Sequence, residues 1–122
     1  MKNDFHIKYI DKKNNGSTNI PLEQLVSILL AMEINIDFHL EALKAQAVVL
    51  RTNILRASRL FGGKGDMKLE LKPLEYYKTI WKDRYNNNIK KINKAVEETK
   101  NLVVTFNHKL IQGKYHLVCG GS

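Results

Sequence analysis

One run constrains the fold more than any other stretch of the chain: FHLEALKAQAVVLRTNILRASR, Phe38 to Arg59. It contains neither Gly nor Pro and is rich in Ala and Leu, residues that favour the helical conformation. The run therefore predicts a helix of about six turns. Apolar residues at three- and four-residue spacing form its core-facing stripe: Leu40, Leu43, Ala47, Leu50 and Ile54.

The other two sides of this helix differ in character. One carries the small residues Ala42, Ala45 and Val49, which we expect to let another element approach closely. The remaining side carries Glu41, Lys44 and Arg51, which we expect to project outward. Glu41 precedes Lys44 by three residues, so the two side chains are close enough to form an ion pair.

A shorter helix is expected before this run, from Pro21 to about Glu33. Proline suits the first turn of a helix, because its missing N–H would have no partner there anyway. The core-facing stripe consists of Leu22, Leu25, Val26 and Leu29. Glu33 lies about 20° from Leu22 around the helix axis, so it places a carboxylate at the end of an apolar face. Asn35 and Asp37 break the helix, and Asp37 is expected to cap the long helix that follows.

Segments with strand character lie at both ends of the chain. Asp4 to Ile10 alternates apolar and polar residues, which predicts a half-buried strand. The polar run from Asp11 to Asn19 then predicts a loop. Near the other end, residues 102–106 and 110–118 are expected to pair as a hairpin, with the N-terminal strand as a candidate third member.

The segment between the long helix and this hairpin has a mixed character. Residues 67–71 form a short alternating stretch, and residues 73–81 predict a short helix or an ordered loop with much of the aromatic mass. Asp83 or Asn86 is expected to cap an amphipathic helix that ends near Lys100. The predicted fold class is α+β, with central helices, a C-terminal β-hairpin and an N-terminal strand in a single domain.

The size and net charge of the chain limit its possible functions. A chain of 122 residues, 43% of them hydrophobic, fits one domain with a modest core. Its net charge of +8 favours an acidic partner such as nucleic acid, an anionic membrane or an acidic polymer. The basic residues are dispersed and match no RNA- or DNA-binding signature, so we expect no nucleic-acid partner. No apolar run is long enough for a signal peptide or a membrane span, so we expect a soluble chain unless it is part of a longer one.

Two acidic residues are candidates for catalysis. Glu33 is expected at the C-terminal end of its helix, where the dipole disfavours ionisation, and on an apolar stripe, where desolvation does the same. Both effects predict a raised pKa, which suits a general acid. Glu41 is expected in the first turn of the long helix, beside Lys44, so an ionised, orienting carboxylate suits it better. The alternative for each residue is an ordinary helix-end acid exposed to solvent.

The histidines and the cysteine form no recognisable metal site. His116 and Cys119 supply two possible ligands, fewer than the four of a structural zinc site. One cysteine also excludes an internal disulfide. No serine lies in a nucleophile elbow, and no Gly-rich phosphate loop opens a helix after a strand. We therefore predict no metal and no cofactor.

The central stretch resembles a known family. PLEQLVSILLAMEINIDFHLEALKAQAVVLRT is similar to the core of stage II sporulation protein D and its relatives. The most specific part is EALKAQAV, Glu41 to Val48, followed by Arg51 and Thr52. Downstream, KINKAVEETKNLVVTFNHKLIQGKYHLVCGGS also resembles the family pattern, so the resemblance covers residues 20–122.

This resemblance implies a peptidoglycan lytic transglycosylase that acts during engulfment in sporulation, in the cell envelope outside the cytoplasmic membrane. In the implied mechanism, one glutamate protonates the glycosidic oxygen between N-acetylmuramic acid (MurNAc) and N-acetylglucosamine (GlcNAc). It then takes the proton of the muramyl 6-hydroxyl, which gives a 1,6-anhydro product. The two glutamates of the family motifs correspond to Glu33 and Glu41, and we favour Glu33 as the acid and base.

The resemblance also implies binding residues and partners. Lys44, Gln46 and Arg51 match the rest of the motif and are candidates for binding the glycan. The alternative is that Lys44 and Arg51 fasten their helix to its neighbours. The implied partners are peptidoglycan glycan strands and other sporulation cell-wall proteins. Related domains in an amidase enhancer leave a second function open, a non-catalytic cell-wall-binding or amidase-enhancing module.

The sequence departs from the family pattern in several places. The departures in the central stretch are Ile34 and Asn35 for Met-Pro, Val49 and Leu50 for two alanines, and Asn53 for tyrosine. Clostridial members are expected to bind zinc through Cys and His after the long helix, but residues 60–82 contain neither. The chain also stops at CGGS and has no N-terminal anchor, so we expect it to lack part of the full family domain.

Overall fold

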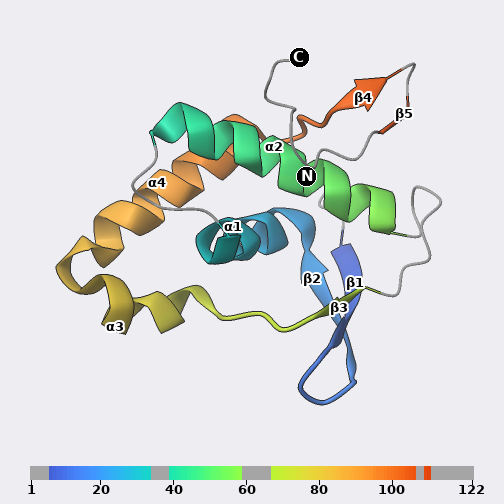
Figure 1. Cartoon of the computed structure of the whole chain (residues 1–122), viewed down its shortest axis with the longest axis horizontal. Coiled ribbons are helices and arrows are strands. Elements are labelled where there is room, and N and C mark those ends of the chain that lie inside the picture. Colours follow the sequence, from blue (N-terminus) through green and yellow to red (C-terminus); the bar gives the residue numbers. More distant parts are fainter. Residues whose placement is uncertain (1–5, 34–38, 59–66, 107–108, 111–122) are drawn as a thin grey trace.

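The computed structural model describes residues 6–33, 39–58, 67–106 and 109–110 (Figure 1). In these residues, three longer helices pack beside a small three-stranded sheet. The helices are α1 (Leu22–Glu33), α2 (Leu40–Ala57) and α4 (Tyr85–Glu98), and the strands are β1 (His6–Asp11), β2 (Ser17–Pro21) and β3 (Lys68–Leu69). The predicted α+β class and the predicted N-terminal strand are confirmed.

β1 is the middle strand of the sheet. β2 pairs with it in antiparallel orientation, with Ile7 opposite Ile20, and β3 pairs with it in parallel orientation. The loop predicted as far as Asn19 is wrong, because β2 begins at Ser17. Backbone pairing with β1 holds this strand, while its side chains from Ser17 to Asn19 stay exposed and give no apolar alternation. In the described residues, β1 therefore belongs to this sheet and does not pair with the described part of the C-terminal hairpin.

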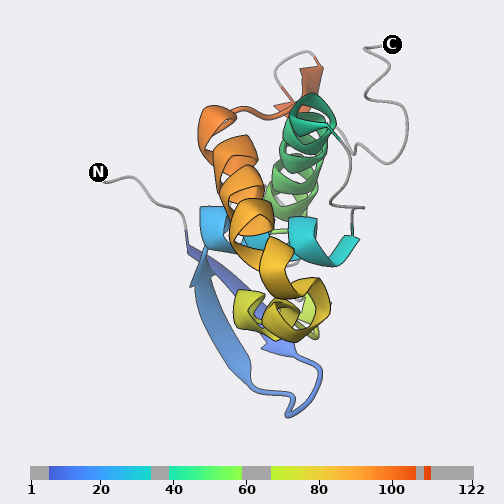
Figure 2. The ribbon, with the colours of Figure 1, turned by 90° about the vertical axis from the view of Figure 1, so that its left-hand side faces the viewer.

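α1 forms the centre of the core. Leu25, Val26 and Leu30 are fully buried. The helix is enclosed because α2 and α4 cover one side of it while the sheet lies on the other (Figures 1 and 2). A helix in such a position is expected to be apolar on nearly all sides. The predicted stripe is confirmed, since Leu22, Leu25, Val26 and Leu29 are all buried.

α2 carries the core stripe that its sequence predicts. Leu43, Ala47, Leu50 and Ile54 are buried, and Leu40 is partly buried against the core. The helix begins at Leu40, and His39 precedes it without a capping hydrogen bond from its side chain. The predicted cap, Asp37, lies outside the described residues.

The other two sides of α2 differ from expectation. Ala42 and Ala45 are exposed, so the predicted close approach at the small-residue face is wrong there. Arg51 was expected to project outward with Glu41 and Lys44, but it is 1% exposed. The reason is the position of α4, whose C-terminal end covers this side of α2 at Arg51 and leaves it open at Glu41.

Short helical turns connect the sheet to α4. They are η2 (Leu74–Tyr77), α3 (Lys78–Trp81) and η3 (Lys82–Arg84), which agrees with the short aromatic helix predicted there. Arg84 precedes α4, where Asp83 or Asn86 was expected as a cap. No capping side chain is needed at this point, because the backbone enters α4 from η3 and is already helical.

The chain after α4 runs back along α2. β4 (Thr105–Phe106) and β5 (Lys109–Leu110) pair in antiparallel orientation, which confirms the start of the predicted hairpin. The rest of the predicted second strand, to Val118, lies outside the described residues.

Candidate functional site

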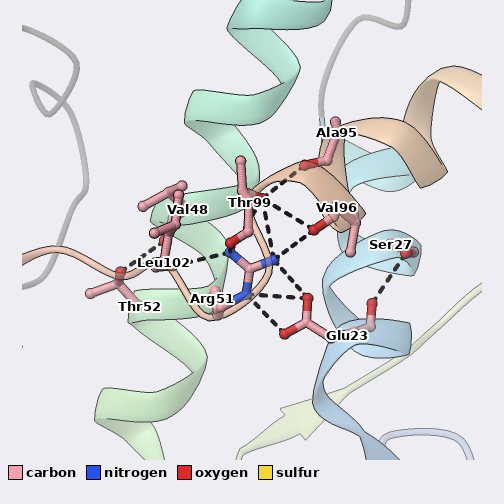
Figure 3. Close-up of polar contacts among 9 residues, drawn as sticks. All are labelled: Glu23, Ser27, Val48, Arg51, Thr52, Ala95, Val96, Thr99 and Leu102. Atoms are coloured by element: carbon pink, nitrogen blue, oxygen red, sulfur yellow. Dashed lines mark hydrogen bonds and ion pairs between the residues drawn. The ribbon is translucent and has the colours of Figure 1, made fainter.

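An ion pair between a buried arginine and a partly exposed glutamate joins the start of α1 to the middle of α2 (Figure 3). The Arg51 guanidinium faces the Glu23 carboxylate, with Nη2 2.6 Å from Oε1 and Nε 3.0 Å from Oε2. The side chain of Arg51 is 1% exposed and that of Glu23 is 26% exposed. A two-point contact between these groups fixes orientation as well as charge. The pair therefore locks α2 against α1.

The remaining donors of Arg51 bind backbone carbonyls at the C-terminal end of α4. Nη1 donates to the carbonyl oxygens of Thr99 at 2.8 Å and Leu102 at 3.0 Å, and Nη2 donates to that of Val96 at 3.3 Å. The last carbonyls of a helix have no partner within the helix and carry partial negative charge. Arg51 supplies both the missing donors and the opposite charge. Glu23, in the first turn of α1, meets the positive end of that helix in the same way.

Thr52 fastens the next part of the chain to α2. Its buried hydroxyl donates to the Val48 carbonyl at 2.7 Å and accepts from the Val104 N–H at 2.9 Å. Residues 103–104, which lead into β4, are thereby held along α2. We call Glu23, Arg51, Thr52 and Thr99 the buried hub.

Lys44 makes a second link between α2 and α4, at the surface. Its ammonium nitrogen lies 3.1 Å from a Glu41 carboxylate oxygen and 3.2 Å from a Glu98 carboxylate oxygen. The hydrogen bonds to Glu41 and then to Glu98 raise the pKa of Lys44 above its ordinary value. The ion pair between Glu41 and Lys44 predicted from their spacing is confirmed. The Glu41 side chain is 81% exposed, so it stays accessible to a ligand.

The predicted catalytic and binding residues lie in different surroundings. Glu33 is the last residue of α1, as expected, and its side chain is outside the described part. Glu41 and Lys44 touch each other at the surface, and Gln46 is half-buried on the same helix. Arg51 lies in the buried hub with its donors occupied, so its geometry favours the fastening role over contact with a glycan.

A cavity of about 810 Å³ opens beside the buried hub. Among its lining residues are Glu23, Gln24, Leu55, Leu74, Asn93 and Lys100. Its size and its mixture of amides with an apolar wall are typical of a site for a small ligand. Glu23 and Glu33 are ten residues apart on α1, about 15 Å along the axis, so this cavity and the predicted catalytic glutamate lie at opposite ends of the helix.

Comparisons with known proteins agree with the motif. The family model described as stage II sporulation protein (SpoIID) matches residues 11–106. The stage II sporulation protein D of Bacillus amyloliquefaciens is 34% identical over 120 residues, and that of Bacillus subtilis (strain 168) is 32% identical over 118 residues. This chain belongs to the SpoIID family. Each alignment covers 88% of the chain and 34% of the relative, so the chain spans about a third of the length of these curated relatives.

Residues of the family motif fasten α2 to the end of α4 and the chain beyond it, and we call this contact the seam. Lys44, Arg51 and Thr52 all reach the segment 96–104, which contains the end of α4 and the chain beyond it. Sequence reasoning missed Glu23, which is 28 residues from its partner Arg51. No local pattern pairs residues so far apart. The available signal was an acid in the first turn of one helix and a motif arginine without an assigned partner.

The described residues contain neither a metal-binding cluster nor a membrane-spanning helix. Across residues 6–33, 39–58, 67–106 and 109–110, no three His, Cys, Asp or Glu side chains are grouped so that they could hold a metal ion. No helix in the same ranges is long and apolar enough to cross a membrane. His116 and Cys119, considered as ligands from the sequence, lie outside these ranges.

Proposed function

We propose that this SpoIID chain is a peptidoglycan lytic transglycosylase that cleaves the bond between MurNAc and GlcNAc and forms 1,6-anhydroMurNAc during engulfment. The observation that carries the proposal is the position of Glu33. This motif glutamate is the last residue of α1, and the EALKAQAV motif begins at the start of the next helix, α2. Membership of the SpoIID family supports the same assignment.

The end of a helix suits a general acid. Partial negative charge on the last carbonyls disfavours the ionised form of a nearby carboxyl group. In the proposed reaction, Glu33 donates its proton to the glycosidic oxygen as the bond from that oxygen to C1 of MurNAc breaks. The resulting carboxylate then accepts the proton of the muramyl 6-hydroxyl, whose oxygen attacks C1. One carboxyl group performs both steps, because the 6-hydroxyl replaces the water that a two-carboxylate hydrolase must activate.

The start of α2 contributes binding groups in this proposal. Glu41 and Lys44 are surface residues held in one pair, so they can orient a glycan beside the reacting bond. Gln46 is the third proposed contact. Arg51 acts by holding α1, α2 and the end of α4 together, since its donors are occupied inside the protein.

Denuded glycan strands test the reaction. The protein, expressed with whatever sequence its reading frame adds on either side, is incubated with the strands, and the products are separated by chromatography and identified by mass spectrometry. We expect 1,6-anhydro products that disappear in Glu33→Gln. Glu41→Gln is the matched control and should keep the same products at a reduced rate. Products that disappear in Glu41→Gln but persist in Glu33→Gln would transfer the catalytic role to Glu41.

The same experiment tests the alternative function. Binding of the strands by the folded protein without any product would replace the proposal with a non-catalytic cell-wall-binding or amidase-enhancing module. The proposal also assigns the protein to the cell envelope, outside the cytoplasmic membrane, with glycan strands and other sporulation cell-wall proteins as partners. A fluorescent fusion that stays in the cytoplasm during sporulation would contradict this location.

A further inference from the structure

Aromatic and aliphatic side chains gather on the short helical turns between β3 and α4. Tyr76 is 45% exposed and Ile80 is 53% exposed, and their four-residue spacing puts them on the same side of a helical turn. Trp81 is half-buried next to them. Figure 1 shows α3 at an outer corner of the fold. We call these three residues, together with Lys72, Lys78 and Lys82, the aromatic–lysine patch.

The three lysines of this patch lie beside aromatic rings or exposed to solvent in the described structure. Within the described residues, none of the three forms an ion pair with a carboxylate. Nζ of Lys72 lies 5.2 Å from the centre of the Tyr76 ring, and Nζ of Lys78 lies 5.7 Å from that of Tyr85. Such cation–π contacts hold the ammonium groups beside the apolar surface without neutralising them.

The charge of the whole segment has the same sign. Four basic residues of segment 72–84 outnumber its two acidic ones: Lys72, Lys78, Lys82 and Arg84 against Glu75 and Asp83. The net charge of the chain, +8, adds to the positive field around the segment. The segment therefore presents apolar side chains in a positively charged setting.

Each aromatic ring of this segment already has a partner beside it in the protein. Tyr77 stacks on Trp81 with ring centres 4.6 Å apart and an angle of 22°, and Trp81 lies tilted against Tyr85 at 6.3 Å. Lys72 and Lys78 lie over the rings of Tyr76 and Tyr85. These contacts reduce the ring area on which a sugar could stack. What remains open here is the aliphatic side chain of Ile80, the exposed part of Tyr76 and the ammonium groups.

We propose that the aromatic–lysine patch docks on an anionic lipid bilayer. Ile80 and the exposed part of Tyr76 enter the boundary between headgroups and acyl chains, and the half-buried Trp81 next to them keeps its stacking on Tyr77. Aromatic side chains with a polar end favour this boundary. The lysines bind lipid phosphates, to which the negative surface potential attracts them. This surface contact does not depend on the proposed catalysis by Glu33.

The chain contains one tryptophan, so emission excited at a wavelength that tyrosine does not absorb reports on Trp81 alone. The protein is titrated with vesicles of phosphatidylglycerol and phosphatidylcholine in equal parts. We expect a blue shift of the Trp81 emission and quenching by brominated acyl chains, both absent with pure phosphatidylcholine. Salt at about 0.5 M should reverse most of the binding, because it screens surface charge.

Variants separate the apolar and the charged contributions. Ile80→Ser should weaken vesicle binding roughly tenfold through the loss of buried aliphatic surface. Replacement of one patch lysine, Lys72→Gln or Lys82→Gln, should weaken it about fivefold. Lys90→Gln, an exposed lysine on α4, is the matched control and should leave the affinity unchanged. Circular dichroism confirms that each variant is folded.

Four results would overturn the proposal. The first is an unchanged Trp81 emission with anionic vesicles. The second is vesicle binding that Ile80→Ser and the lysine variants do not weaken, because another surface would then be responsible. The third is an emission shift with denuded glycan strands and none with vesicles, which would assign the patch to sugar. The fourth is an emission shift of equal size with soluble polyglutamate, which would show that charge attraction alone, without a bilayer, accounts for the binding.

Discussion

Lys44 and Arg51 lie two turns apart on the same side of α2, and both reach the C-terminal end of α4, yet their environments are opposite. Arg51 is 1% exposed and bonds Glu23 and three backbone carbonyls. Lys44 has 25% of its side chain exposed and contacts two carboxylates. A buried cation needs a partner for every donor, whereas a partly exposed cation can also be solvated by water. The seam is therefore rigid at one end and adjustable at the other.

This difference separates the parts that hold the fold from those that are free to meet a ligand. The rigid end connects the start of α1 with the end of α4 through Arg51. The open end lies at the start of α2, which follows the end of α1 and therefore Glu33. The proposed chemistry thus belongs to the open end, and the buried hub keeps the helices that carry it in register.

Removal of the buried guanidinium should have the largest effect on stability. Arg51→Met leaves the Glu23 carboxylate and the carbonyls at the end of α4 without donors, so we expect the free energy of unfolding to fall by about 3–5 kcal/mol. Arg51→Lys should recover only part of this loss, since an ammonium group has three donors in place of five. Urea unfolding followed by circular dichroism measures both.

Lys44→Arg is the matched control for this series. It also exchanges a lysine and an arginine on the same side of α2, but at the open end, so we expect an unchanged urea midpoint. A wild-type midpoint for Arg51→Met, or an equal loss in Lys44→Arg, would contradict the distinction between the two ends.

The carboxylate side of the buried pair should matter less. The Glu23 side chain is partly exposed, and Glu23→Gln keeps one acceptor for Arg51. We therefore expect the free energy of unfolding to fall by about 1.5–3 kcal/mol. If the two residues act as one unit, the double variant with Arg51→Met should lose less than the sum of the two single losses. Strict additivity in the same unfolding measurements would show that Arg51 is stabilised mainly by the end of α4.

The hydroxyl of Thr52 should contribute least among the buried contacts. Thr52→Val deprives the Val104 N–H of its acceptor, and we expect a loss of about 1 kcal/mol together with faster hydrogen exchange at that amide. Thr18→Val, at an exposed position of β2, is the control and should leave exchange at Val104 unchanged. Unaltered exchange at Val104 in Thr52→Val would remove Thr52 from the seam.

Periodicity predicted the helices well because their core faces are continuous. The stripes with Leu25 and Val26 on α1 and with Leu43 and Ala47 on α2 are buried as expected. β2 was missed because backbone pairing holds it, and its exposed polar side chains resemble those of a loop.

The environment of the seam could not be predicted in the same way. Periodicity gives the direction of a side chain around one helix, so Lys44 and Arg51 were equivalent in the sequence. It does not say how far a second helix extends along that side. The partner of Arg51 is 28 residues away in α1, beyond the reach of any helical repeat. Glu33 became a candidate through its predicted position at a helix end on an apolar stripe, and the family motif then favoured it over the alternative of an ordinary helix-end acid.

The ion pairs of Lys44 at the open end should change the pH dependence of stability only at high pH. Glu41 and Glu98 raise the pKa of Lys44 above its ordinary value of 10.5 by favouring the protonated form in the folded state. This contribution to stability is fully present below pH 10.5 and is lost as the pH rises through the folded-state pKa. Lys44→Met should therefore change the urea midpoint little at pH 7 and flatten its decline above about pH 10, with the difference reduced by salt. An alkaline decline as steep as that of the wild type would mean that Lys44 is as unpaired in solution as any solvated lysine, and the seam would then end at Arg51.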